Sequence, residues 1–182
     1  MPQNQTRAAA ALWTDLLLVV FLIAFDIAAR LLPHVPGIWP FAASALFAGR
    51  MLRIPALAVV VPLAAVVLSN TVLAGDDWRI TLVVCAAITL PALAGILTRH
   101  YRGAVATAAT MVACSLIFFF STNFAVWAFS GLYAHTMNGL VQCYVAALPF
   151  LDRTVIGDLF WAAVLFGGAW LVQNAPMLRR AL

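Results

Sequence analysis

The sequence predicts an all-α integral membrane protein: one six-helix bundle over residues 1–182, with a long outer connection between the fifth and sixth helices. Three observations lead to this fold class. Hydrophobic residues make up 65% of the 182 residues and charged residues only 9%, whereas a soluble domain is typically about half apolar and about a quarter charged. The length leaves room for about six spans of roughly 20 residues each. The basic residues lie mainly between or beside the apolar runs.

The first two apolar segments differ in length. Residues 12–32 are long enough to cross a bilayer. We expect this segment to be retained as a signal anchor, because Asp26 and the later spans argue against a cleaved signal peptide. Residues 38–49 cover only about 18 Å of the roughly 30 Å hydrocarbon core. The second segment is therefore predicted to be a partial span, or to extend through Arg50 by snorkelling.

The remaining spans are predicted at 54–74, 80–98, 104–121 and 154–174. Between the last two lies the connection 122–153, which is rich in aromatic and polar residues. Its part 136–151 is apolar enough to dip back into the membrane, and such a segment must hide its backbone ends in protein or water. A lid over a cavity meets this requirement, so the connection is predicted to form a lid.

The arginines predict the orientation in the membrane. Seven of them lie in the termini and turns of one side and two on the other. The positive-inside rule makes the arginine-rich side cytoplasmic, which predicts a multi-pass protein of the prokaryotic inner membrane with both termini in the cytoplasm. Nucleic acid is not an expected partner, because there is no soluble basic domain. The seven are Arg7, Arg50, Arg53, Arg99, Arg102, Arg179 and Arg180, and the two are Arg79 and Arg153.

Several polar residues within the spans lie at a similar depth, within roughly 10 Å of the outer face. Ionisable residues in lipid cost several kcal/mol unless they are paired or face a wet cavity, so a cluster at one level predicts a shared polar cavity. Two structural alternatives remain open: pairing of Asp26 with Arg30, one helical turn away, and interhelical hydrogen bonds from Asn70 and Thr122. The residues at this depth are Asp26, Asn70, Cys85, Thr122, Asn123 and Asp158.

The outer connections add aromatic, acidic and histidine side chains above this cavity. An interfacial aromatic belt is the alternative explanation for Trp78 and Trp127. Replacement of Trp127 or Arg153 is predicted to weaken ligand binding. The predicted substrate-binding residues are His34, Trp39, Asn70, Asp76, Asp77, Trp78, Cys85, Asn123, Trp127, Tyr133, His135, Tyr144 and Arg153.

Three stretches carry a family resemblance: the Pro-Phe-Ala-Ala block within 33–49, STNFAVW at 121–127, and GLVQCYVAALPF followed by TVIGDLFWAAVLFGG. Over roughly residues 20–170 the chain resembles a family of small prokaryotic membrane proteins. That family in turn resembles the substrate-binding (S) components of energy-coupling factor vitamin transporters. The resemblance implies an outer substrate pocket and uptake of a vitamin-like micronutrient. It also implies an energy-coupling transmembrane partner on the first helix, where Ala24 and Ala28 are spaced for close helix packing.

A solitary branch of S-component-like transporters handles cobalamin, and this makes Cys85 a candidate cobalt ligand if the transported molecule is a corrinoid. A thiolate is a soft ligand that suits a transition metal. The alternative is that Cys85 is a small packing residue. His34 and His135 are further candidate metal ligands. Apart from such a transported ligand, no cofactor is predicted, because the three scattered cysteines fit neither a disulfide framework nor a structural zinc site.

Two other function classes stay open. A membrane-embedded enzyme on a lipid-linked substrate would use Asp76, Asp77 or His135 as acid or base, but the chain has neither H-E-x-x-H nor G-x-S-x-G. The prediction is therefore a protein that is not an enzyme. A structural or assembly protein would bind no ligand and would tolerate substitutions on the outer face.

Overall fold

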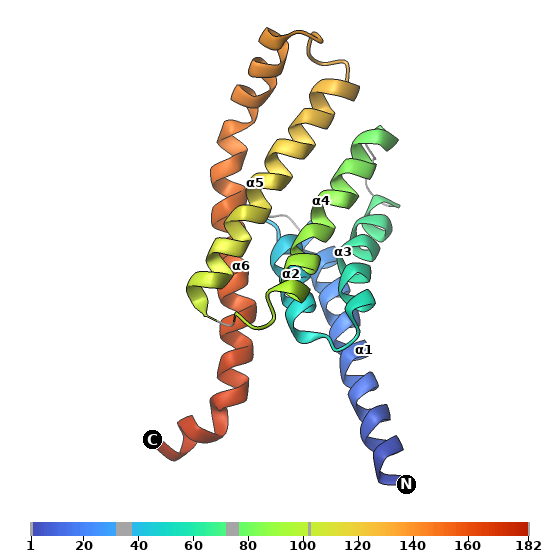
Figure 1. Cartoon of the computed structure of the whole chain (residues 1–182), viewed down its shortest axis with the longest axis vertical. Coiled ribbons are helices and arrows are strands. Elements are labelled where there is room, and N and C mark those ends of the chain that lie inside the picture. The colour runs from blue at the N-terminus through green and yellow to red at the C-terminus, as the bar shows by residue number, and fades with distance from the viewer. Residues whose placement is uncertain (1, 32–37, 72–76, 102, 182) are drawn as a thin grey trace.

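The structure, a computed structural model, describes residues 2–31, 38–71, 77–101 and 103–181. These residues form six α-helices, which confirms the predicted all-α class. Figure 1 shows them packed as an elongated bundle. The helices are α1 (Pro2–Leu31), α2 (Phe41–Met51), α3 (Pro55–Asn70), α4 (Trp78–Leu97), α5 (Ala104–Phe129) and α6 (Met137–Ala181).

Four of the helices are long and apolar enough to cross a membrane: Ala9–Leu31, Trp78–Leu97, Ala104–Phe129 and Met137–Ala175. The apolar helix α3 is shorter, with 16 residues. The outward faces are apolar as well, since Leu97 is 78% exposed and Val105 is 84% exposed. Exposed apolar side chains of this number indicate contact with the lipid bilayer.

Helix α2 lies in the centre of the bundle and packs against α4, α6 and α3. It has 11 residues, of which Ala43–Gly49 are all buried. Its length of about 16 Å agrees with the predicted partial span. Small residues allow the close contact: a Cβ atom on Gly95 of α4 would lie 2.5 Å from the carbonyl oxygen of Leu46 and 3.0 Å from the Cα of Gly49. Only glycine fits at this crossing.

The predicted long outer connection 122–153 is wrong. Helix α5 continues to Phe129 and α6 begins at Met137, so only residues 130–136 join them, and they turn through Gly131 with φ of 71°. The polar run does not end α5, because its side chains bond to carbonyls of the same helix. Thr122 Oγ1 donates to Phe118 O at 2.7 Å and Asn123 Nδ2 to Phe119 O at 2.8 Å. In place of a lid, the two helices form a hairpin (Figure 1).

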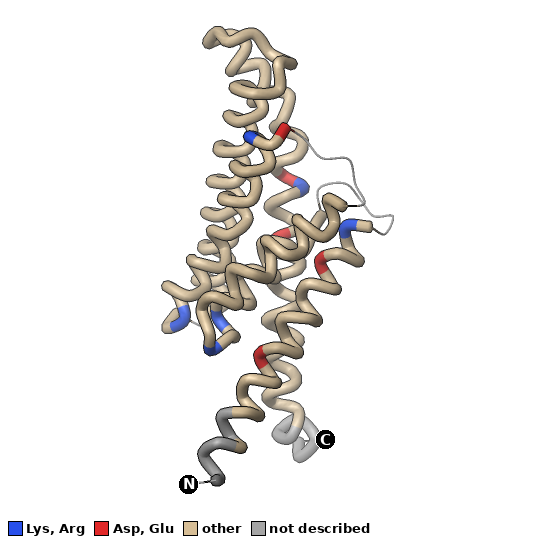
Figure 2. Tube along the Cα trace, turned by 90° about the vertical axis from the view of Figure 1, so that its right-hand side faces the viewer, with Lys and Arg blue, Asp and Glu red and all other residues tan. Residues whose placement is uncertain are grey.

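The bundle has two different ends. Both ends of the chain, the turn 52–54 and the turn residues 98–101 lie in the lower half of Figure 1, and we name this side of the bundle the basic end. The turn 130–136 lies at the opposite end, named the hairpin end. Figure 2 shows basic residues gathered beside the turns of the basic end. There Arg53 forms an ion pair of 3.1 Å with the buried Asp15 and so ties the turn after α2 to α1.

Candidate functional site

A cavity of about 470 Å³ lies between α2 and the hairpin end, and we name it the hairpin-side cavity. Every helix contributes to its wall. The chain segments that form it are far apart in the sequence, so the cavity is a property of the assembled bundle and of no single motif. One lining residue from each helix, in chain order, is Arg30, Phe41, Val66, Val84, Cys114 and Asp158.

A buried acid stands in the wall between α5 and α6. Ser115 Oγ donates a hydrogen bond of 2.6 Å to Asp158 Oδ2, and the two residues are 1% and 5% exposed. An acid is tolerated in an apolar helix where it is hydrogen-bonded and faces a polar cavity. The pair therefore gives the cavity an acceptor that is fixed in place.

A second acid–serine pair lies next to the cavity but outside its lining. Ser44 Oγ of α2 donates to Asp26 Oδ2 of α1 at 2.6 Å, and both residues are fully buried. The other oxygen, Asp26 Oδ1, has no hydrogen-bond partner within the described residues. This pair joins α1 to the central helix and fixes the position of the α1 end that carries Arg30.

Arg30 supplies the positive charge of the cavity. Its Nη1 donates to Ser69 Oγ of α3 at 2.8 Å, and its guanidinium lies 6.0 Å from the centre of the Phe41 ring. The rest of the wall is mainly apolar and includes four aromatic side chains. The aromatic lining residues are Trp39, Phe41, Phe118 and Phe150. The arrangement combines one cation, one hydrogen-bonded acid and flat apolar surfaces, which suits an amphipathic organic molecule.

Of the predicted site residues, Trp39 lines this cavity. A second group comes together at the hairpin end. Trp127 Nε1 donates to Ala134 O at 3.0 Å and its ring lies 5.5 Å from that of His135. Tyr144 Oη donates to Phe120 O at 2.8 Å. These contacts join α5 to α6 and hold the hairpin together, and none of the three predicted residues lines the cavity.

Three further predicted residues lie at the start of α4 or within it, outside the cavity lining. Asp77 caps α4 by accepting a 2.8 Å hydrogen bond from Arg79 N, and Trp78 beside it is 66% exposed. Cys85 is half-buried and follows the lining residue Val84, but it does not line the cavity itself.

Four more predicted residues do not line the cavity, and two lie outside the described residues. Asn123 bonds within α5. Asn70 is the last residue of α3, Tyr133 lies in the hairpin turn, and Arg153 is exposed on α6. His34 and Asp76 lie outside the described residues.

Most of the cavity wall consists of residues that the sequence does not single out. The sequence predicts that Asp158 borders a polar cavity, which it lines, but it does not predict the partner Ser115. A single serine in an apolar run is the signal that could have identified it. Phe118 and Phe150 give no such signal, because phenylalanine is as common on a helix face in contact with lipid as on one that lines a cavity. Apart from Asp158, the polar or aromatic lining residues that were not predicted as part of a cavity are Arg30, Phe41, Cys114, Ser115, Phe118, Phe150 and Thr154.

Within the described part of the chain, no three His, Cys, Asp or Glu side chains lie close enough together to hold a metal ion. The comparisons with known proteins add one finding: a family model described as a family of unknown function (DUF6580) matches residues 10–179. No curated protein and no solved structure matches the chain.

Proposed function

The chain belongs to the family of unknown function DUF6580, and we propose that it is a substrate-binding membrane protein for the uptake of a vitamin-like micronutrient. The observation that carries the proposal is the hairpin-side cavity, to which all six helices contribute. Among its described lining residues the cavity has one acid, Asp158, which already accepts from Ser115, and no second acid or histidine to act with it in acid–base catalysis. A purely structural protein would not need a cavity with charged groups in its wall, since such groups cost free energy in a membrane bundle.

The lining defines the class of ligand. A volume of about 470 Å³ falls within the range of about 300–1,000 Å³ that is usual for small-molecule sites. Trp39 and Phe150 offer flat surfaces to a ring system. Arg30 can donate to an anionic or carbonyl group of the solute, and Asp158 can accept from an amine or hydroxyl group. The solute is therefore a one- or two-ring organic molecule with polar groups of both kinds.

This ligand class is smaller than a corrinoid, the large macrocycle of cobalamin. Cys85 does not line the cavity, and the thiol in the wall is that of Cys114, which is buried. Cobalamin stays a prediction of the sequence resemblance that the cavity does not support.

The proposed orientation places the hairpin end outside and the basic end in the cytoplasm of a prokaryotic cell. The support is the position of Arg50 in the last turn of α2 and of Arg53 and Arg99 in the turns of the basic end, as the positive-inside rule requires. The hairpin-side cavity then faces the side from which a nutrient arrives.

The proposed energy-coupling partner docks on α1. Ala24 and Ala28 are both exposed on this helix, and Phe21 and Leu31 beside them are exposed as well. Small residues one turn apart let a second helix approach closely. This part of the proposal also rests on the resemblance to S components.

A matched pair of variants tests the binding function. Val83 and Val84 are neighbouring, half-buried residues of α4, and of the two only Val84 lines the cavity. The protein is purified in mild detergent and the small molecules that remain bound are identified by mass spectrometry. We expect wild type and Val83→Phe to retain the same small organic solute and Val84→Phe to lose it. A wild-type protein without any bound solute, or equal retention by both variants, would favour a structural role.

A further inference from the structure

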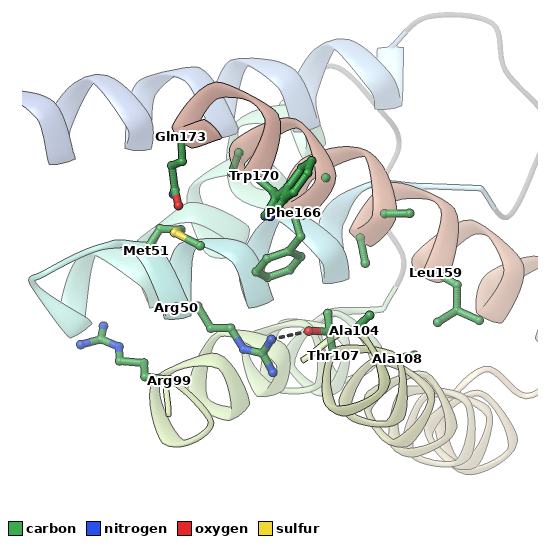
Figure 3. A pocket seen from close by; sticks show the side chains of 14 residues that line it. Arg50, Met51, Arg99, Ala104, Thr107, Ala108, Leu159, Phe166, Trp170 and Gln173 are labelled. Atoms are coloured by element: carbon green, nitrogen blue, oxygen red, sulfur yellow. Dashed lines mark hydrogen bonds between the residues drawn. The ribbon is translucent and has the colours of Figure 1, made fainter. Parts of the chain in front are cut away.

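A second cavity, of about 800 Å³, opens at the basic end (Figure 3). It lies between the last turn of α2, the start of α5 and the second half of α6. We name it the basic-end cavity. Its lining includes Arg50, Arg99, Thr107, Phe166, Trp170 and Gln173.

The two cavities are separate. A cluster of buried apolar residues from α2, α5 and α6 lies between them: Ala43, Leu46, Met111 and Ala162. Along α5, Thr107 lines the basic-end cavity, Met111 belongs to the cluster and Cys114 lines the hairpin-side cavity. The basic-end cavity is thus a site of its own.

Arg50 places a positive charge in the wall of this cavity. Its guanidinium donates to Thr98 Oγ1, at 3.1 Å from Nη2, and to Thr107 Oγ1, and lies 5.4 Å from the centre of the Phe166 ring. Figure 3 shows the guanidinium between α2 and the start of α5, beneath the ring of Phe166. All of these partners are uncharged, and the threonine bonds leave some of its N–H groups for another acceptor.

Arg99 adds a second positive charge. Its Nε donates to Gly49 O at 2.8 Å and its Nη2 to Leu52 O at 2.6 Å, which again are uncharged groups. Arg53 differs, because it is paired with Asp15. Among the described residues this is the one ion pair, and no acidic residue lines the basic-end cavity.

We propose that the basic-end cavity is a binding site for a phosphate group attached to an apolar moiety. Two guanidinium groups without an acidic partner attract a dianion, and arginine N–H groups match phosphate oxygens in geometry. Phe166, Trp170 and Leu159 provide an apolar wall for the rest of the ligand. The phosphate belongs either to a phospholipid or to a soluble phosphate ester.

The test compares ligands that differ only in the phosphate. Binding of dioleoyl phosphatidic acid and of dioleoylglycerol to the full-length protein in detergent is measured by native mass spectrometry. We expect preferential binding of phosphatidic acid. Competition by millimolar inorganic phosphate assigns the site to soluble phosphate esters, and undiminished binding assigns it to the lipid headgroup.

Two kinds of variant locate the binding. Arg50→Gln removes a charge, and Arg53→Gln removes one from the same end of the bundle outside the cavity. Gly167→Leu fills the cavity without changing charge, because a Cβ atom there meets nothing within 4 Å. Gly168→Leu is its control, since Gly168 has equally open surroundings but is not a lining residue.

We expect Arg50→Gln and Gly167→Leu to bind phosphatidic acid about tenfold more weakly than wild type. Arg50→Gln removes a charged contact with the phosphate, and Gly167→Leu fills the space that the ligand would occupy. Arg53→Gln and Gly168→Leu should bind it as wild type does. If Arg50→Gln fails to fold, Gly167→Leu alone decides the question. Wild type that binds phosphatidic acid no better than dioleoylglycerol, or Gly167→Leu that binds as wild type does, would overturn the proposal.

Discussion

At the scale of single residues, the bundle depends on acids that each accept a hydrogen bond from a serine. Asp26 and Asp158 lie in apolar helices and are bonded by Ser44 and Ser115 of neighbouring helices. A buried acid without such a donor bears the full cost of leaving water. These serines therefore do more for stability than their small size indicates.

Replacement of Ser44 tests this role. Ser44→Ala removes the hydroxyl that donates to Asp26, a residue with no exposed surface. The expected loss in the free energy of unfolding is about 1–3 kcal/mol, the usual result of leaving a buried polar group without its partner. The measurement is denaturant unfolding in detergent.

Ser121→Ala is the control for this experiment. Ser121 bonds to carbonyls of its own helix, at 2.7 Å for Ile117 O, so its loss should change the free energy of unfolding by no more than about 0.5 kcal/mol. Equal losses for the two variants would show that the bond between Ser44 and Asp26 adds nothing.

The buried acids could be recognised in the sequence, but their hydrogen-bond donors could not. Hydropathy predicts where Asp26 and Asp158 lie along their helices, and the depth estimate placed both near one level. It does not predict which neighbouring helix faces them, because that depends on how the helices rotate and cross. The aromatic residues show the same limit. Trp127 and Tyr144 were expected to contact a ligand, yet they bond to backbone carbonyls across the hairpin.

At the scale of helices, the central contact is that of α2 with α4. An 11-residue helix cannot cross a membrane by itself, so α2 is held in place by its neighbours. Its glycine and alanine residues let the backbones of the two helices touch. This packing brings Phe41 and Ala42 to one cavity and Arg50 to the other.

Gly95→Ala tests the α2–α4 crossing. The added methyl group would lie 2.5 Å from Leu46 O, so the helices must move apart. We expect a loss of about 1–3 kcal/mol in the free energy of unfolding, which is typical of overpacking. Gly168→Ala, where the methyl group meets nothing within 4 Å, should be neutral or slightly stabilising. A neutral Gly95→Ala would mean that the helices are not in contact at this glycine.

The helix positions were largely predictable, whereas the helix ends were not. Runs of apolar residues predicted all six helices and the shortness of the second. Ser121, Thr122 and Asn123 were interpreted as the end of the fifth span, because polar residues usually leave a membrane. Their side chains bond back to carbonyls of α5 instead, so the helix continues and the predicted lid does not form.

At the scale of the whole molecule, two cavities follow one another along the bundle; all six helices line the first, and α2, α5 and α6 line most of the second. The hairpin-side cavity combines one arginine with one acid, and the basic-end cavity has arginines alone. The buried cluster around Met111 separates them. A solute that passes from one end to the other must cross this cluster, which makes it the natural barrier in the proposed uptake. The separation also lets the two ligand proposals be tested independently.

The central claim is that the hairpin-side cavity holds a small organic solute. An experimental structure of the protein, purified in mild detergent without added ligand, tests it most directly. We expect non-protein density in the cavity, in contact with Trp39 and within hydrogen-bonding distance of Arg30 or Asp158. Lipid chains in this space, or side chains that close it, would contradict the claim.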